Sequence, residues 1–175
     1  MREVWDLDAS PAFLEALLTD LFRNHWPSIT FGPIIQGAAW EIGARQAPRR
    51  IGMQDGYLTV DFGHLHFHLC IGEHRGEPGN PTPPELAAHR RTSRAELYRR
   101  INRDGTPDSW GLRLFNGKGE QQITVLFPNP FLTDEQQFRA APDWSRLALW
   151  DQVRKRYLGL DPDPRDRSGR RLDHG

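Results

Sequence analysis

Residues 50–71 read RIGMQDGYLTVDFGHLHFHLCI, and this stretch gives the strongest indication of the fold. Asp55-Gly56 separates two apolar runs, a pattern that is typical of a tight turn between paired strands. The sequence therefore predicts one strand over residues 50–53 and a second, long strand over residues 57–71. A glycine inside a strand often marks a bend, so we expect the long strand to bend at Gly63.

The second predicted strand has two chemically different faces. Side chains alternate across a strand, so residues two apart in the sequence project from the same face. After Gly63, one face carries the large apolar residues Leu65, Phe67, Leu69 and Ile71. The other face carries His64, His66, His68 and Cys70. We expect the apolar face to pack on the core and the histidine face to point away from it.

Helices and a second hairpin surround this stretch. Ser10 and Pro11 supply a capping hydroxyl and a proline at the first helical position, which is typical of a helix start. Asp143 caps a last helix that ends at Gly159. Residues 110–127 form another hairpin around a glycine-rich turn. Because the pairings are local, we expect an α+β fold: a mainly antiparallel sheet of about five or six strands, with about three or four helices packed mostly on one face.

The length and composition suit one globular domain over residues 1–160. The chain has 175 residues, of which 23 are basic and 23 acidic, so its formal net charge is +0. A neutral chain is a poor candidate for general nucleic-acid binding. The tail over residues 161–175, DPDPRDRSGRRLDHG, is polar and rich in charge, which predicts disorder.

The sequence also suggests a cellular compartment. Its single cysteine excludes an intramolecular disulfide and suits a reducing environment. The first residues, MREVWDLDAS, contain no apolar segment of a signal peptide, and no run approaches the roughly 18 apolar residues of a membrane span. We therefore expect a cytoplasmic protein that contacts neither membrane nor nucleic acid.

The histidine face suggests a metal site. His66 and His68 are about 6.7 Å apart along a strand, and both can lean onto one ion. His64 is about 13 Å from His68 in a straight strand, so we expect one histidine pair to ligate, with the third histidine and Cys70 beside it. Nitrogen, oxygen and thiol donors favour zinc, iron, nickel or cobalt.

Further ligands have to come from outside the histidine strand. Glu73 and His74, just beyond the strand, are candidates for these ligands and for a catalytic acid or base. More distant candidates are His89, Glu41 and Glu120.

Arginines supply candidate anion-binding groups. Thr82 and Glu85 form a capping box, which predicts a helix over residues 83–102. Arg90 and Arg94 lie on this predicted helix, and Arg113 lies on a strand of the second hairpin. Arginine is a bidentate donor to carboxylates and phosphates, so these side chains could hold an anionic substrate. The alternative is that they are solvated or paired with neighbouring carboxylates.

Three hypotheses of function follow. The first is a metal-binding protein with an HxHxH ligand cluster, in one form a hydrolase- or lyase-like enzyme acting on a small anionic substrate. The second is a non-enzymatic metal-handling or accessory protein. The third is a metal-free module whose histidine face contacts a small ligand or a second copy of the chain, as a homodimer.

Overall fold

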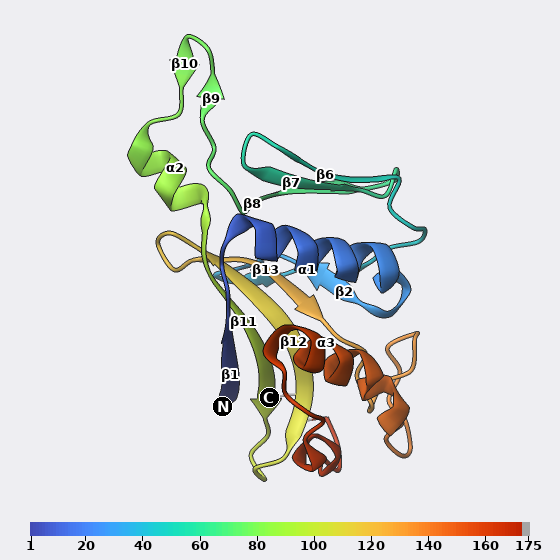
Figure 1. Cartoon of the computed structure of the whole chain (residues 1–175). Coiled ribbons are helices and arrows are strands. Elements are labelled where there is room, and N and C mark those ends of the chain that lie inside the picture. Colours follow the sequence, from blue (N-terminus) through green and yellow to red (C-terminus); the bar gives the residue numbers. More distant parts are fainter. Residues whose placement is uncertain (173–175) are drawn as a thin grey trace.

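The computed structural model describes residues 1–172, and its largest element is a six-stranded antiparallel sheet (Figure 1). In spatial order its strands are β1 (Arg2–Leu7), β11 (Thr92–Ile101), β12 (Pro107–Asn116), β13 (Gln121–Leu126), β2 (Thr30–Gly32) and β5 (Ile42–Gly43). Every pairing in this sheet is antiparallel. The predicted second hairpin is therefore present as β12 and β13 at the centre of the sheet.

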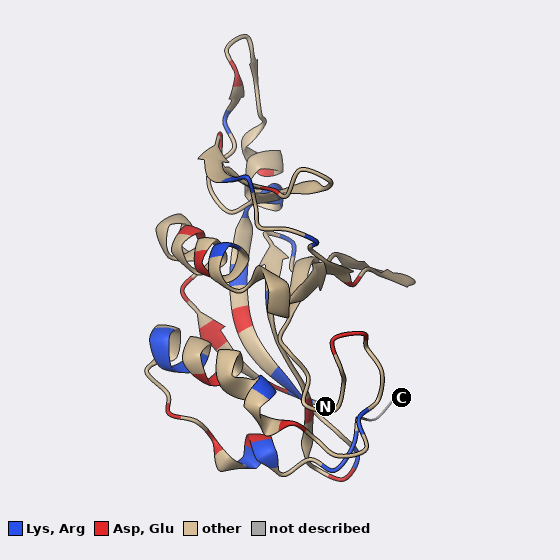
Figure 2. Ribbon diagram, turned by 90° about the vertical axis from the view of Figure 1, so that its right-hand side faces the viewer, with Lys and Arg blue, Asp and Glu red and all other residues tan. Residues whose placement is uncertain are grey.

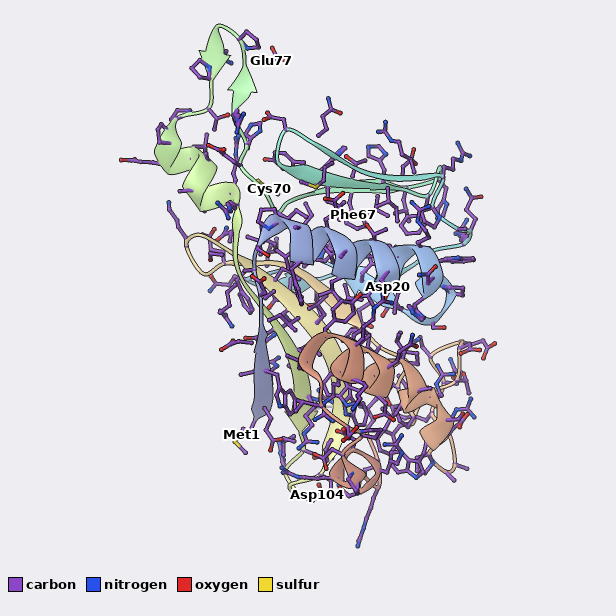
Figure 3. All side chains as sticks on the ribbon, viewed as in Figure 1. Met1, Asp20, Phe67, Cys70, Glu77 and Asp104 are labelled. Atoms are coloured by element: carbon purple, nitrogen blue, oxygen red, sulfur yellow. The ribbon has the colours of Figure 1, made fainter. Side chains whose placement is uncertain are left out.

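Helices α1 (Pro11–Asn24) and α3 (Ala148–Leu158) cover one face of this sheet (Figure 1). The third helix, α2 (Pro84–Arg90), lies beyond the N-terminal end of β11, beside a small hairpin over residues 76–81. Short 3-10 helices are present as η1 (Trp26–Ser28), η2 (Trp144–Leu147) and η3 (Pro164–Arg167). The ring of Trp150 on α3 packs edge-on against Trp5 on β1. Asp20 lies between α1 and α3, where it accepts hydrogen bonds from Arg156 and Tyr157 (Figure 3). The predicted α+β class and sheet type are confirmed.

A second sheet lies on the other side of α1 (Figure 1). It contains β6 (Arg50–Gln54), β7 (Tyr57–Asp61) and β8 (His66–Cys70). Asp55 and Gly56 have positive φ angles of 44° and 81°, as a two-residue hairpin turn requires. Phe67 of β8 points toward α1 and meets Phe22 at 5.2 Å between ring centroids (Figure 3). Thus α1 is sandwiched between the two sheets.

Two small hairpins complete the fold. One pairs β3 (Ile34–Ile35) with β4 (Ala38–Ala39), and the other pairs β9 (Gly76–Glu77) with β10 (Asn80–Pro81). The second of these projects from the body of the molecule beside α2 (Figure 1). In the described part of the chain, no helix combines the length and apolar character needed to cross a membrane.

The prediction of a single long strand over residues 57–71 is wrong. The chain reverses between Asp61 and His66, so that β7 and β8 pair with each other. Gly63 has a φ of 87°, and its N–H donates to the Asp61 carboxylate at 2.7 Å. The predicted bend at this glycine is thus a full reversal, because a positive φ and a capping carboxylate together close a tight turn.

The helix predicted over residues 83–102 is also wrong beyond Arg90. Only α2 is helical, and β11 follows it directly. β11 forms ladders with both β1 and β12, so its backbone groups are satisfied on both sides. Arginine and glutamate are good helix formers, but this tertiary pairing overrides their local preference.

The polar composition of residues 161–175 predicts disorder, whereas the structure shows contacts between this segment and the sheet. Residues 161–172 return to the sheet, and η3 places Asp166 in full burial. The indole N–H groups of Trp110 and Trp150 each donate to Asp166 at 2.8 Å. Residues 173–175 of the predicted tail lie outside the described residues, and a single domain over residues 1–160 remains a prediction.

Candidate functional site

The histidines do not form one row. His66 and His68 project from the outer face of β8, with their ring centroids 5.3 Å apart. The Nδ1 atom of His68 lies 2.8 Å from the Thr59 hydroxyl on the neighbouring strand. His64 lies outside both strands, in the turn between β7 and β8, because the chain reverses there.

The predicted transition-metal site is therefore wrong. Among residues 1–172, no group of three or more His, Cys, Asp or Glu side chains is placed to hold a metal ion. The turn separates His64 from the His66–His68 pair, and Cys70 is buried at the far end of β8. This finding contradicts two hypotheses, that of a metal-dependent hydrolase or lyase and that of a metal-handling protein.

Cys70, Glu73 and His74 have structural partners. The Cys70 thiol lies 3.5 Å from the Gly72 carbonyl, and burial raises its pKa, which disfavours the reactive thiolate. Nδ1 of His74 lies 2.8 Å from the Asp55 carboxylate. Glu73 pairs with Arg75 on the surface. The contact between His74 and Asp55 holds the turn after β8 against the β6–β7 turn.

The candidate arginines are separated by the change from helix to strand. Arg90 ends α2, whereas Arg94 and Arg113 lie on adjacent strands and both pair with the buried carboxylate of Glu96. Figure 2 shows such basic and acidic residues in bands along the strands of the six-stranded sheet. Arg94 also packs over the Phe115 ring, with Cζ 3.6 Å from the centroid. The predicted anion clamp on one helix does not form.

A cavity of about 510 Å³ lies on the face of the six-stranded sheet opposite α1 and α3, and we call it the sheet-face pocket. Tyr98, Ser109 and Thr124 contribute to its floor, because they alternate along the strands with core residues that face the helices. The segments around β3–β4 and residues 128–138 form its walls. Its aromatic, aliphatic and basic lining includes Trp40, Tyr98, Phe127, Phe138, Ile34, Leu126, Leu132, Arg2, Arg100 and Arg146.

The floor of the sheet-face pocket depends on a small residue. A Cβ atom at Gly111 would lie 2.9 Å from Cε1 and 3.1 Å from the hydroxyl of Tyr98. The Tyr98 ring therefore lies close over the backbone of β12. Arg113 packs against this ring at 4.8 Å, and burial raises the pKa of the Tyr98 hydroxyl. At this point of the floor, a neutral and largely buried phenol packs against the Arg113 guanidinium.

The wall of the sheet-face pocket depends on another glycine. A Cβ atom at Gly32 would lie 2.1 Å from the Trp40 carbonyl oxygen, so only glycine lets this part of the wall pack on β2. The Trp40 N–H donates to the Pro33 carbonyl at 3.2 Å, which closes the β3–β4 hairpin behind the indole. Trp40 lines the pocket and is 46% exposed overall, so part of this large aromatic residue is accessible to a ligand.

Sequence reasoning missed this pocket because it assigned residues 92–101 to a helix. Once they are placed in a strand, Tyr98 and Arg100 fall on one face and Leu97 and Ile101 on the other. That alternation is the signal that could have identified the floor. The wall residues carry no comparable signal, because loops far apart in the sequence bring them together.

The fold and the site together define an α+β protein with a pocket on the free face of an antiparallel sheet. Residues 1–159 match the family model described as "Family of unknown function (DUF7676)", and the chain belongs to this family. No curated protein shows significant sequence similarity to it.

Solved structures extend the comparison of folds. "Crystal structure of ChuX" has a TM-score of 0.50 at 12% identity, over 91% of this chain and 78% of that one. "Structure of the Heme Binding Protein ChuX" has a TM-score of 0.47 at 13% identity, over 79% and 69%. At 12% identity, the likeness to the first of these structures shows a shared fold.

Proposed function

We propose that this protein binds a small molecule in the sheet-face pocket, and that the ligand is haem or a closely related carboxylated tetrapyrrole. The observation that carries the proposal is the pocket itself. Its volume of about 510 Å³ lies within the range of roughly 300–1,000 Å³ that is typical of ligand sites. Its lining combines aromatic and aliphatic side chains with a similar share of polar and charged ones, so it offers both apolar contact and hydrogen-bonding groups.

The pocket has two chemically distinct ends. Ile34 and Trp40 lie near β2, where apolar surface dominates. Arg2 and Arg100 lie on β1 and β11, at the opposite edge of the sheet. A flat apolar molecule with carboxylates along one edge matches this arrangement, and haem is such a molecule. The shared fold with ChuX, which is described as a haem-binding protein, adds support.

The lining fits the macrocycle better than it fits the iron. Haem iron is held in proteins by His, Cys, Met or Tyr side chains. Tyr98 is of such a type, but burial raises the pKa of its hydroxyl and so disfavours the phenolate. We therefore attribute binding to contacts with the ring and its carboxylates.

Titration of the purified protein with hemin tests the proposal, with Soret absorbance and tryptophan fluorescence as readouts. Saturable binding is expected, and iron-free protoporphyrin IX should bind as well because the ring supplies most contacts. Trp40→Ala should weaken hemin roughly tenfold through the loss of aromatic contact, about 1.4 kcal/mol.

A control removes the exposed histidine pair on β8, because imidazole is a common ligand of haem iron. The double substitution His66→Ala with His68→Ala alters the outer face of β8 and should leave hemin affinity unchanged. Loss of binding in this variant, with full binding in Trp40→Ala, would place the ligand on the histidine face and overturn the proposal. Failure of hemin to saturate the unaltered protein would overturn it too.

A further inference from the structure

We infer that Arg2, held opposite Arg100 at one end of the sheet-face pocket, recognises a carboxylate of the ligand. The inference rests on the proposed function and deepens it, because it names the group on the ligand that the pocket selects. The structure supports it through strand register, the distribution of counter-charges and the position of the site.

The register of the sheet brings the two arginines together. β1 and β11 pair so that Arg2 is directly opposite Arg100. Residues directly opposite in an antiparallel pair have Cβ atoms about 4.5–5.5 Å apart and project from the same face. Both side chains line the sheet-face pocket. Two like charges directly opposite each other destabilise a sheet, and in this pair Arg100 has a carboxylate partner, Asp108.

The counter-charges in this region are unevenly distributed. Arg100 makes a bidentate pair with the buried carboxylate of Asp108, at 2.7 and 2.9 Å. Arg146, which also lines the pocket, pairs with Asp134 at 2.7 Å. Arg2 lies 5.9 Å from the centroid of the Tyr98 ring, and in the described part of the chain it has no carboxylate partner. Its guanidinium is therefore available to a ligand.

The acidic side chain of the pocket lining is at the other end. Glu41 immediately precedes β5, which lies five strand spacings from β1. Glu41 and Arg2 therefore lie at opposite edges of the sheet. A ligand carboxylate is therefore favoured beside Arg2 and disfavoured beside Glu41.

The chemistry of the site suits a carboxylate better than a neutral polar group. An arginine offers two parallel N–H donors that match the two oxygens of a carboxylate. The Ser109 and Thr124 hydroxyls on the floor add neutral hydrogen-bonding groups without adding negative charge.

The test compares hemin with hemin dimethyl ester, in which the carboxylates are masked and the ring is unchanged. The unaltered protein should bind hemin about tenfold more tightly than the ester. Arg2→Gln should weaken hemin by about the same factor and leave the ester unchanged, and Arg2→Lys should restore part of the difference. Arg75→Gln, at an exposed arginine on the far side of β8, is the control and should change neither affinity.

The outcomes separate this inference from the proposed function. Equal affinity for hemin and its ester, or equal weakening of both by Arg2→Gln, would overturn the role of Arg2 while haem binding stands. Absence of hemin binding to the unaltered protein would overturn both. Thermal denaturation of Arg2→Gln confirms that the variant is folded, since Arg2 is exposed and its removal should not lower stability.

Discussion

At the scale of single residues, several polar contacts of the core converge on the carboxylate of Asp166. It is fully buried, and it accepts hydrogen bonds from two indoles and from Arg99 at 2.9 Å. Arg154 lies within 3.4 Å on the side of α3. A buried carboxylate is tolerated only when cations and donors surround it in this way.

Replacement of Asp166 by Asn should therefore destabilise the protein strongly. The change removes the negative charge that balances buried Arg99 and Arg154, and breaking such a pair costs about 3–5 kcal/mol. Urea denaturation followed by tryptophan fluorescence measures the change. Asp161→Asn, in an exposed pair with Lys155, is the matched control and should leave the free energy of unfolding nearly unchanged. Similar stability of the two variants would contradict the assigned role of Asp166.

Gly32 offers a second test at this scale. Gly32→Ala places a methyl group against the Trp40 backbone, so the wall of the sheet-face pocket has to shift. We expect a loss of about 1–3 kcal/mol in unfolding free energy and a change in tryptophan emission. Gly43→Ala is the control, because a Cβ atom at Gly43 meets nothing within 4 Å and this residue lies on the next strand. Equal stability of the two variants would show that the wall tolerates the methyl group.

At the scale of elements, an ion-pair network fastens the C-terminal segment to the edge of the sheet. Arg99 on β11 pairs with Glu3 on β1 and with Asp163 just before η3, both at 2.7 Å. Arg165 in η3 pairs with Glu3 at 2.6 Å. Burial by itself would raise the pKa values of Glu3 and Asp163. Hydrogen bonds from Arg99 and Arg165 to both carboxylates outweigh this effect, so both pKa values are lowered.

This network predicts a loss of stability in acid. Because the folded-state pKa values are lowered, the stabilisation is present above the unfolded-state values of 4.5 for Glu3 and 3.8 for Asp163. It is lost as the pH falls through the folded-state values. Urea denaturation at a series of pH values measures this slope, and Glu3→Gln should make it shallower. An unchanged slope in that variant would assign the acid sensitivity to other carboxylates.

At the scale of the whole molecule, the C-terminal residues act as part of the core although the family match ends at residue 159. Asp166 in this segment accepts hydrogen bonds from the indoles of Trp110 and Trp150, whose side chains are buried in the full chain. Gly169 also packs closely, because a Cβ atom there would lie 2.5 Å from the Pro107 carbonyl oxygen. The fold of residues 1–160 thus depends on a segment that lies outside the matched region.

A chain truncated after Leu160 should therefore be much less stable than the full chain. The truncation exposes two tryptophans and leaves Arg99 without its buried partner Asp166. Thermal denaturation compares the two chains, and a peptide of residues 161–175 added in trans should partly restore the midpoint. A truncated chain as stable as the full one would show that the segment only rests on the surface.

Local signals in the sequence were sufficient to predict where several elements begin, turn or end. Asp55-Gly56 specifies a turn through its backbone preferences, Pro11 favours a helix start, and Gly159 adopts the left-handed conformation, with φ of 70°, that ends α3. The alternation in β8 correctly placed Phe67 toward the core and His66 and His68 outward. Each of these depends on residues within a few positions of one another, so the sequence alone carries the information.

The remaining features depend on contacts between distant residues. β11 is a strand because β1 and β12 satisfy its backbone on both sides, against the helix preference of its arginines and glutamate. The polar C-terminal segment is ordered because Asp166 meets indoles from β12 and α3. The sheet-face pocket exists because loops after β2 and β13 meet over the free face of the sheet. Local composition contains none of these partners, and pairing and burial supply the free energy that overrides it.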